Sequence, residues 1–300
     1  MIKFNDLPST MDGMKQCFQR GVELGDVLTD FFAEQTNTKG IIIMEMEKAC
    51  WPFLNWPEKK RYISRYFEHP DGKPKIDAKG VQLVRRDGTP IGKKLYKQCV
   101  DCIIPLEGAM KTRAQIAKEV TETITATLEQ IKKKELPIEE YIITKSLRAS
   151  YKNSNQPHVA VRDKILQRIA NHEMTRDPPK SGDRVGYVVV QKKGKAKVYE
   201  RAEDPEWAVE YGLKPDRVYI VQNSLEKMIV VLVKYFTNVT PLFRRYLNEI
   251  NRQQNGNQSI TNFFGTSSSS NNNALVVRPV APPPKKKRKK KKSDIRNFFS

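Results

Sequence analysis

Two acidic side chains, Glu45 and Glu47, stand one residue apart and alternate with Met44 and Met46. This alternation has the period of a β-strand, so it predicts a strand over residues 41–48 with both carboxylates on one face. Carboxylates hold the divalent metal ions of phosphoryl transfer, but that chemistry uses two ions and more acids than these two. Two roles stay open for the pair: auxiliary acids beside a metal site, or ion pairs with a nearby Lys or Arg.

A second group of candidate functional residues consists of basic residues together with one tyrosine and one glycine. It comprises Lys59, Lys60, Arg61, Tyr62, Lys79, Gly80, Arg85 and Arg86. On a strand predicted over residues 60–67, Lys60 and Tyr62 share a face and together offer a charged donor and a flat ring with a hydroxyl. Lys79 and the two arginines suit phosphates, and Gly80 lets the backbone approach closely. Because phosphates and many minor-groove atoms are common to all sequences, such a set would grip a duplex without reading it. The alternative is a solvated strand edge with a half-buried tyrosine.

The cysteines offer little metal or disulfide chemistry. The chain has four of them, unevenly spaced, at Cys17, Cys50, Cys99 and Cys102. This number and spacing favour a reducing compartment over a disulfide framework, and semi-buried thiols are the simplest interpretation. Cys99 and Cys102 form a single Cys-x-x-Cys pair without a second pair or a histidine group at metal spacing, so we predict no metal on this chain.

The last fifty residues differ in composition from the rest. Asn, Gln and Ser crowd residues 253–273, prolines follow, and residues 285–292 are all basic. The segment 251–300 carries eleven basic residues against one acid, so half of the net charge of +20 lies there and half on the first 250 residues. Such a composition cannot bury enough apolar surface to offset chain entropy, which predicts a disordered tail. The basic first part favours a polyanionic partner.

The tail contains two phenylalanine pairs that have no core to join. Each pair follows an aliphatic residue by three positions, so one helical turn would place the three side chains together as a plug for an apolar pocket. The stretch 257–264 resembles the sliding-clamp-binding box, with Asn257 in place of the usual Gln, and the C-terminus repeats its second half. We predict clamp binding by Ile260, Phe263, Phe264, Ile295, Phe298 and Phe299. The alternative is chance in a low-complexity tail.

The basic run of the tail follows three prolines and resembles a monopartite nuclear localisation signal. It consists of Lys285, Lys286, Lys287, Arg288 and Lys289. This resemblance predicts a nuclear import receptor as partner and a nuclear location. The alternative is a nonspecific DNA tether, and both roles are compatible.

Apolar spacing predicts mixed helices and strands over the first 250 residues. Helical spacing covers residues 12–35, 94–134, 138–151, 161–172, 205–211 and 215–250. Strand-like runs cover residues 41–48, 60–67, 185–190 and 198–201, the last two as a hairpin. No run of about 18 apolar residues occurs, so we predict no membrane partner, and the first residues do not form a secretory leader.

Three stretches resemble DNA polymerase family B, the group that includes replicative polymerase delta and the polymerases of large DNA viruses. Residues 45–50 with 59–62 are similar to the acidic palm strand and the Lys-x-Tyr motif of the family. Residues 75–87 are similar to its Lys-Gly-hydrophobic-Glu-hydrophobic-Val-Arg-Arg-Asp block. Residues 156–159, 182–185 and 202–205 follow the order and spacing of its thumb. The stretches are collinear over about residues 1–245.

The resemblance implies an α+β fold. Residues 1–93 would be the C-terminal part of a palm, residues 94–250 a mostly helical thumb with a small β-hairpin, and residues 251–300 the disordered tail. It also implies that the basic group described above, together with His158 and Arg184, contacts primer–template DNA. The implied activity is that of a DNA-directed DNA polymerase, a nucleotidyltransferase of DNA replication.

The resemblance further implies Mg²⁺ for the complete polymerase and none on this chain alone, because the two principal metal-binding aspartates of the family precede the segment that matches residues 1–4. We therefore expect an N-terminal polymerase half as a partner, through a split gene or a truncated reading frame. Gln82 replaces a usual Glu. The two cysteine clusters that end cellular delta-type enzymes are missing, which favours a large DNA virus as the source; the nucleus would then be that of the host. The alternatives are a stand-alone DNA- and clamp-binding accessory protein and, disfavoured by the mixed α/β pattern, a basic chromatin-like protein.

Overall fold

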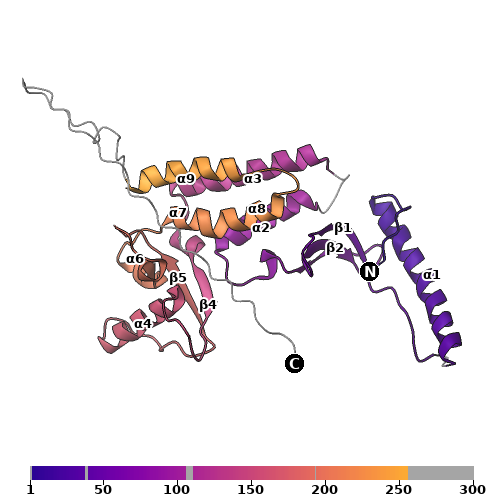
Figure 1. The fold of residues 1–300 in the computed structure, drawn as a ribbon, viewed down its shortest axis with the longest axis horizontal. Coiled ribbons are helices and arrows are strands. Elements are labelled where there is room, and N and C mark those ends of the chain that lie inside the picture. Colours follow the sequence, from indigo (N-terminus) through magenta and orange to yellow (C-terminus); the bar gives the residue numbers. More distant parts are fainter. Residues whose placement is uncertain (1, 38–39, 106–110, 193, 256–300) are drawn as a thin grey trace, which may run out of the picture. The chain divides into compact units, whose positions relative to one another are not determined.

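Two three-stranded antiparallel sheets and the helices around them make up the described part of the chain (Figure 1). The computed structural model describes residues 2–37, 40–105, 111–192 and 194–255. This mixture of helices and small antiparallel sheets confirms the predicted α+β class. No helix in those ranges is long and apolar enough to cross a membrane.

The first element is helix α1 (Met11–Thr36), close to the predicted 12–35. It begins where the hydroxyl of Thr10 accepts a hydrogen bond from the backbone of Gly13 at 3.2 Å, the usual N-cap arrangement. It ends at Asn37, whose φ of 50° is left-handed. Its buried side chains form a small core with the first sheet, made of Met14, Phe18, Ala49 and Phe67.

The first sheet has the strand order β1 (Ala49–Asn55), β2 (Tyr62–Phe67) and β3 (Lys75–Lys79). β2 is the central strand, and its register with β3 pairs Tyr62 with Lys79. A bulge interrupts β1 between Cys50 and Phe53. A 3-10 turn, η1 (Gln82–Val84), follows β3 and leads to the helices.

The strand predicted over residues 41–48 is wrong, because the first strand begins only at Ala49. Residues 43–48 form no regular structure and pair with no strand in the described part of the chain. They pass close along α1, since a Cβ on Gly25 would lie 2.6 Å from the carbonyl oxygen of Met44 and one on Gly21 would lie 2.4 Å from the sulfur of Met46. Gly21 and Gly25 are one helical turn, about 6 Å, apart on α1. Met46 and Met44, which lie against them, are only two residues apart, so the chain is extended there.

The second region combines helices with the second sheet, ordered β4, β5, β6. Its strands are β4 (Ile143–Ser146), β5 (Arg184–Val189) and β6 (Ala202–Glu203). Its longer helices are α2 (Pro90–Ile103), α3 (Arg113–Lys133), α4 (Pro157–Ala170) and α9 (Thr240–Asn255). The shorter ones are η2 (Ile138–Tyr141), α5 (Val198–Arg201), α6 (Pro205–Glu210), α7 (Arg217–Ile220), the π-helical η3 (Val221–Glu226) and α8 (Lys227–Val233).

One large apolar core joins these elements, and α2, α3, α8 and α9 lie together in Figure 1. Each of these helices, and strand β5, contributes fully buried side chains to the core. Examples, in chain order, are Leu95, Ile124, Val188, Ile229 and Phe243. The first sheet is tied to this core as well. The ring nitrogen of Trp56 donates to the carbonyl of Val231 at 3.4 Å, and the guanidinium of Arg65 bonds the carbonyl of Ile104 at 2.6 Å and the carboxylate of Asp101 at 2.9 Å.

The helical stretch predicted over 94–134 is two separate helices, α2 and α3, and three further predicted elements of this region differ in the structure. Residues 138–151 were expected to be helical, but only η2 is, and β4 follows because Ile143 and Thr144 pair with β5. Residues 198–201 form the helical turn α5, and the pairing with β5 falls on the next two residues, β6. Helix α9 continues to Asn255, five residues into the predicted tail. The predicted strand at 185–190 and helix at 205–211 are confirmed within one residue at each end.

Candidate nucleic-acid interface

The turn between β1 and β2 holds the first basic residues. Lys60 has a left-handed φ of 58° and precedes β2, so the prediction that Lys60 and Tyr62 share the face of one strand is wrong. The turn instead touches the end of β3. A Cβ on Gly80, whose φ is +67°, would lie 2.6 Å from the carbonyl oxygen of Lys60. Only a residue without a side chain fits there, so glycine brings Lys79 close to the turn that carries Lys59 and Lys60, which we call the lysine turn.

The ring of Tyr62 is held by groups on both neighbouring strands. It stacks on Phe53 with 5.4 Å between ring centroids, and its hydroxyl donates to Asp77 Oδ2 at 3.1 Å. Lys48 Nζ donates to the same oxygen at 3.1 Å. Burial pushes the pKa of Asp77 upwards, but the hydrogen bonds from Lys48 and Tyr62 outweigh it and leave that pKa below its usual value. No pattern in the sequence assigns Asp77 to this site, because only the pairing of β2 with β3 places it here.

The segment 81–87, which follows β3, carries two arginines, of which one is paired with an acid and the other is not. Arg85 forms two hydrogen bonds with Asp87, at 3.0 and 2.8 Å, which offset most of its charge. The side chain of Arg86 is exposed and makes no ion pair with any described residue. The carbonyl of Arg86 accepts from Arg184 Nη2 at 3.2 Å and from Thr144 Oγ1 at 3.1 Å. The segment is therefore fastened to the second sheet beside Arg184.

His158 does not lie on the surface, in contrast to its predicted contact with DNA. Its side chain is 3% exposed, and its Nε2 lies 3.2 Å from the hydroxyl of Tyr151. That hydroxyl in turn accepts from the backbone of Arg148 at 2.7 Å. Burial lowers the pKa of His158, and the nearby cations Lys145, Arg148 and Arg162 lower it further. In this structure the imidazole shapes the 148–151 segment rather than offering a surface.

The acids of residues 45–47 do not assemble a metal centre with other groups. Both carboxylates are exposed, and Glu47 Oε1 lies 3.6 Å from Lys48 Nζ, as in the ion-pair alternative. Within the described ranges, no group of three or more His, Cys, Asp or Glu side chains could hold a metal ion. These residues alone therefore do not fit a two-ion magnesium site.

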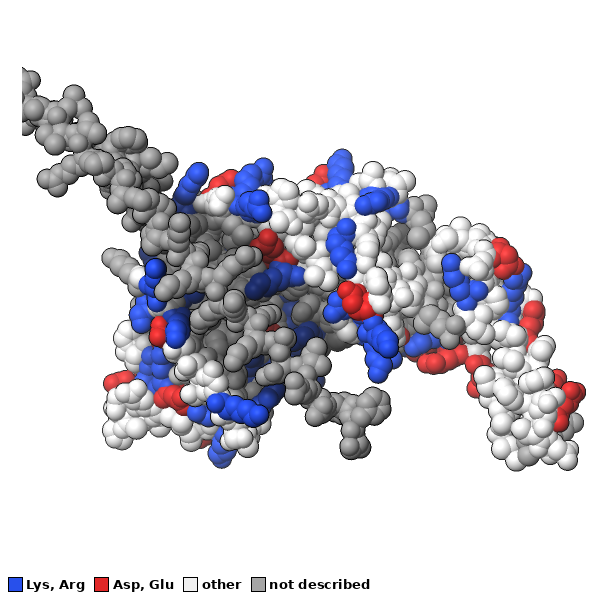
Figure 2. Space-filling view, in the orientation of Figure 1, with Lys and Arg blue, Asp and Glu red and all other residues white. Residues whose placement is uncertain are grey.

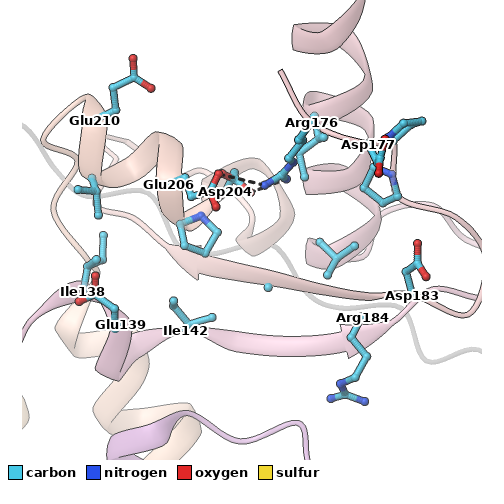
Figure 3. Close-up of a pocket in the computed structure, with 17 residues that line it drawn as sticks. Ile138, Glu139, Ile142, Arg176, Asp177, Asp183, Arg184, Asp204, Glu206 and Glu210 are labelled. Carbon is cyan, nitrogen blue, oxygen red and sulfur yellow. Dashed lines mark hydrogen bonds and ion pairs between the residues drawn. The ribbon is translucent and has the colours of Figure 1, made fainter. Parts of the chain in front are cut away.

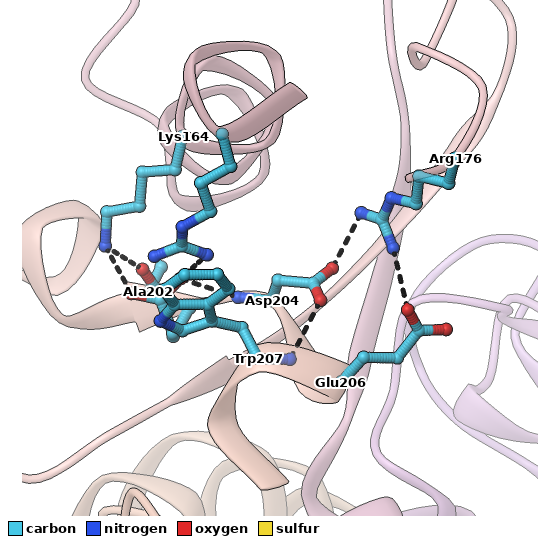
Figure 4. Close-up of polar contacts among 8 residues, drawn as sticks. Lys164, Arg176, Ala202, Asp204, Glu206 and Trp207 are labelled. Carbon is cyan, nitrogen blue, oxygen red and sulfur yellow. Dashed lines mark hydrogen bonds and ion pairs between the residues drawn. The ribbon is translucent and has the colours of Figure 1, made fainter. Parts of the chain in front are cut away.

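The 202–205 stretch instead builds a buried polar cluster (Figure 4). Glu203 accepts hydrogen bonds from Arg168 at 2.8 Å and Lys164 at 3.0 Å, and Arg168 lies over the ring of Trp207. Asp204 caps α6 and pairs with Arg176 at 2.8 Å. Burial raises the pKa of Glu203, but the two cations outweigh that effect and lower it. This stretch is structural and joins α4, β6 and α6.

The remaining predicted residues fall into two groups. All four cysteines are free, and burial raises the pKa of Cys99 to about 12, so its thiol is unreactive. The predicted clamp-binding and nuclear-localisation residues, 260–299, lie outside the described residues.

Six cations of the predicted set lie on connected elements, and we call them the basic strip: Lys59, Lys60, Lys79, Arg85, Arg86 and Arg184. The contact between Gly80 and the lysine turn connects Lys79 with Lys59 and Lys60. The hydrogen bond from Arg184 to the carbonyl of Arg86 connects the two arginines at the other end of the strip. All except Lys79 and Arg184 belong to two short segments, 59–60 and 85–86. Figure 2 shows lysines and arginines spread over the face in view, with acids gathered towards the end that bears α1. The strip suits a polyanion of any sequence.

Comparison with known proteins identifies relatives. The profile of DNA polymerase family B matches residues 13–236. The chain is 35% identical over 213 residues to a DNA polymerase of Paramecium bursaria Chlorella virus NY2A, covering 69% of this chain and 21% of that protein. It is 29% identical over 217 residues to the DNA polymerase delta catalytic subunit of Drosophila melanogaster, covering 71% of this chain and 18% of that protein. A solved family B DNA polymerase from Pyrobaculum calidifontis aligns with a TM-score of 0.49 and 23% identity, over 68% of this chain and 24% of that one. The chain spans about a fifth of the length of the curated relatives it matches.

Proposed function

The chain belongs to DNA polymerase family B, and we propose that it is the duplex-holding part of a DNA-directed DNA polymerase. In this proposal residues 1–93 end the palm, residues 94–250 form the thumb, and the basic strip binds primer–template DNA. The observation that supports it most is the physical linkage of three separate motifs: the lysine turn contacts Gly80, and Arg86 contacts Arg184. Together they present cations to successive phosphates without a base-reading element.

A second polypeptide segment would complete the palm and supply the catalytic acids that hold Mg²⁺. Exposed apolar side chains support this proposal, since they crowd α1 and the segment after it. They are Val22, Val27, Phe31, Ile41, Ile42, Ile43 and Met44, exposed by between 38% and 75%. An extended apolar segment without a strand partner is suited to receive one. Residues 43–48 would then become the strand that their sequence predicts, with Glu45 and Glu47 close to the added acids.

The tail would tether this assembly to a sliding clamp through Ile260, Phe263, Phe264, Ile295, Phe298 and Phe299. The basic run 285–289 would bind a nuclear import receptor, so the polymerase would replicate DNA in the nucleus. Relatives from a large DNA virus and from eukaryotic replication are compatible with that location. Clamp pulldown by the chain and by its double Phe263→Ala, Phe264→Ala and Phe298→Ala, Phe299→Ala variants measures this part. Unchanged pulldown by the combined variant would refute it.

Duplex affinity as a function of salt tests the grip. We expect Lys60→Gln and Arg86→Gln each to weaken binding roughly five- to tenfold at 0.1 M salt and to reduce the salt slope by about 0.9, the value for one lost phosphate contact. Arg85→Gln should cost less, because Asp87 already pairs with that guanidinium. Lys133→Gln, an exposed lysine of α3 outside the strip, is the control. Equal affinities of the Arg86 and Lys133 variants would contradict the assignment.

Primer extension tests the enzyme as a whole. The chain alone should not extend a primer, and adding a polypeptide that carries the family's acidic catalytic motifs should restore synthesis. If the two proteins bind each other and DNA yet do not extend a primer, the alternative of an accessory DNA- and clamp-binding protein is favoured.

A further inference from the structure

A groove of about 960 Å³ lies between the second sheet, α6 and the 176–183 connection (Figure 3). Its floor is apolar and is formed by Ile142, Ile165, Val185 and Pro205. Gly186 keeps this floor open, because a Cβ there would already lie 3.3 Å from a methyl group of Ile142. A groove of this volume suits a small molecule or a short peptide segment.

The rim of the groove is acidic although the whole chain has a net charge of +20. Its exposed acids are Glu139, Asp177, Asp183, Glu206 and Glu210, and the buried Asp204 also lines the groove. Of the two arginines that line it, Arg176 is paired with Asp204 at 2.8 Å and Glu206 at 3.5 Å. Figure 3 shows Arg184 pointing away from α6, and its hydrogen bonds go to Ser146, Thr144 and Arg86. The groove therefore repels phosphates and attracts cations.

Three of the rim acids are available for a ligand. Glu139, Asp177 and Glu210 are exposed and form no ion pair with any described residue. Beside them stands Val209, an apolar side chain that is 56% exposed. Unpaired carboxylates next to exposed apolar surface match a ligand that carries positive charge and aliphatic groups together.

We infer that this groove binds a basic segment of another protein that carries aliphatic residues between its lysines or arginines. Its aliphatic side chains would cover the floor and Val209, and its cations would meet the rim acids. An extended segment of about six residues, about 20 Å long, fits a groove of this kind. DNA is excluded by the charge of the rim, so this partner could be bound while the basic strip holds a duplex. The inference does not depend on the proposed polymerase function.

Fluorescence polarisation with the full chain and a labelled Val-Pro-Lys-Val-Pro-Lys peptide tests the inference. Joint substitution Glu139→Gln, Asp177→Asn and Glu210→Gln should weaken binding about five- to tenfold. The matched control removes three exposed acids of α1, through Glu23→Gln, Asp26→Asn and Glu34→Gln, and should bind as the wild type does. A second pair separates the apolar contribution: Val209→Ser should weaken binding, and Val27→Ser on α1 should not.

Several results would overturn the inference. They are the absence of measurable peptide binding, equal affinities of the two triple variants, and displacement of the peptide by a short DNA duplex. Self-association of the chain that Val209→Ser abolishes would assign the groove to a second copy instead.

Discussion

Replacing Gly80 by alanine probes the contact on which the basic strip depends. The glycine has a φ of +67°, and a Cβ would stand 2.6 Å from the carbonyl oxygen of Lys60. Two separate costs follow. An alanine in the left-handed region costs about 1 kcal/mol. Moving the lysine turn away from the new methyl group costs about 2 kcal/mol more, because backbone rather than a flexible side chain must shift.

Gly212 provides a control for the first cost alone. Its φ of +61° is nearly the same, but a Cβ there would meet nothing within 4 Å. We therefore expect Gly80→Ala to lower the free energy of unfolding by about 3 kcal/mol and Gly212→Ala by about 1 kcal/mol. The difference between the variants isolates the close approach, free of the backbone strain that they share.

Urea unfolding followed by circular dichroism measures both variants, and duplex affinity measures the consequence for the strip. Because the turn must move, Gly80→Ala should also weaken DNA binding, whereas Gly212→Ala should leave it unchanged. If the two variants unfold within about 0.5 kcal/mol of each other, the distance argument is wrong.

Three further substitutions test the buried polar groups. Glu203→Gln should lower the free energy of unfolding by about 3 kcal/mol at pH 7, because it removes the charge of the buried carboxylate that pairs with the partly buried Arg168 and Lys164. The folded-state pKa of Glu203 is lowered, so this stabilisation is complete above the unfolded pKa of about 4.3 and is lost as the pH falls through the folded pKa. Urea unfolding at a series of pH values should therefore show the two proteins converging at acid pH. Arg217→Met should lower the free energy of unfolding by about 2–3 kcal/mol in the same assay, because this arginine is 3% exposed and its guanidinium donates to two carbonyls at the end of α3. The control is Arg245→Met on the surface, which should lower it by less than about 0.5 kcal/mol. Burial lowers the pKa of His158 in the folded chain, so on acidification the unfolded chain takes up this proton at a higher pH than the folded chain does. The free energy of unfolding of the wild type should therefore fall as the pH drops below about 6.5, and His158→Phe should lack this contribution to the pH dependence.

The sequence predicted those elements whose pattern is local. Helix α1 and strand β5 were placed within one residue because an apolar stripe or a run of β-branched residues is complete within the segment. The two main failures that concern strands share one cause. Residues 41–48 have the pattern of a strand but no partner strand in the described part of the chain. The apolar spacing predicts a helix where strand β4 lies, because the partner strand β5 is about forty residues further along the chain. Strand pairing is a property of distant segments, which a pattern along the chain does not contain.

The same limit applies to the candidate interface. The types of Lys60, Gly80 and Arg86 indicate a surface for a polyanion, but the resemblance to the polymerase family was needed to predict them as one DNA-binding group. The partners that decide their state came only from the fold. Asp87 offsets the charge of Arg85, and Asp77 fixes the hydroxyl of Tyr62 from the adjacent strand. Burial of His158 also required the tertiary packing of α4.

The unpaired segment along α1 has a consequence for the life of the chain in a cell. Its exposed Ile41, Ile42 and Ile43 combine high strand propensity with low charge, the composition from which intermolecular β-structure grows. Gly21 and Gly25 hold the neighbouring residues extended, so the segment is already in the shape that such growth requires. Synthesised without a covering strand, the chain should depend on chaperones for solubility, and the timing of its partner's synthesis becomes part of its folding.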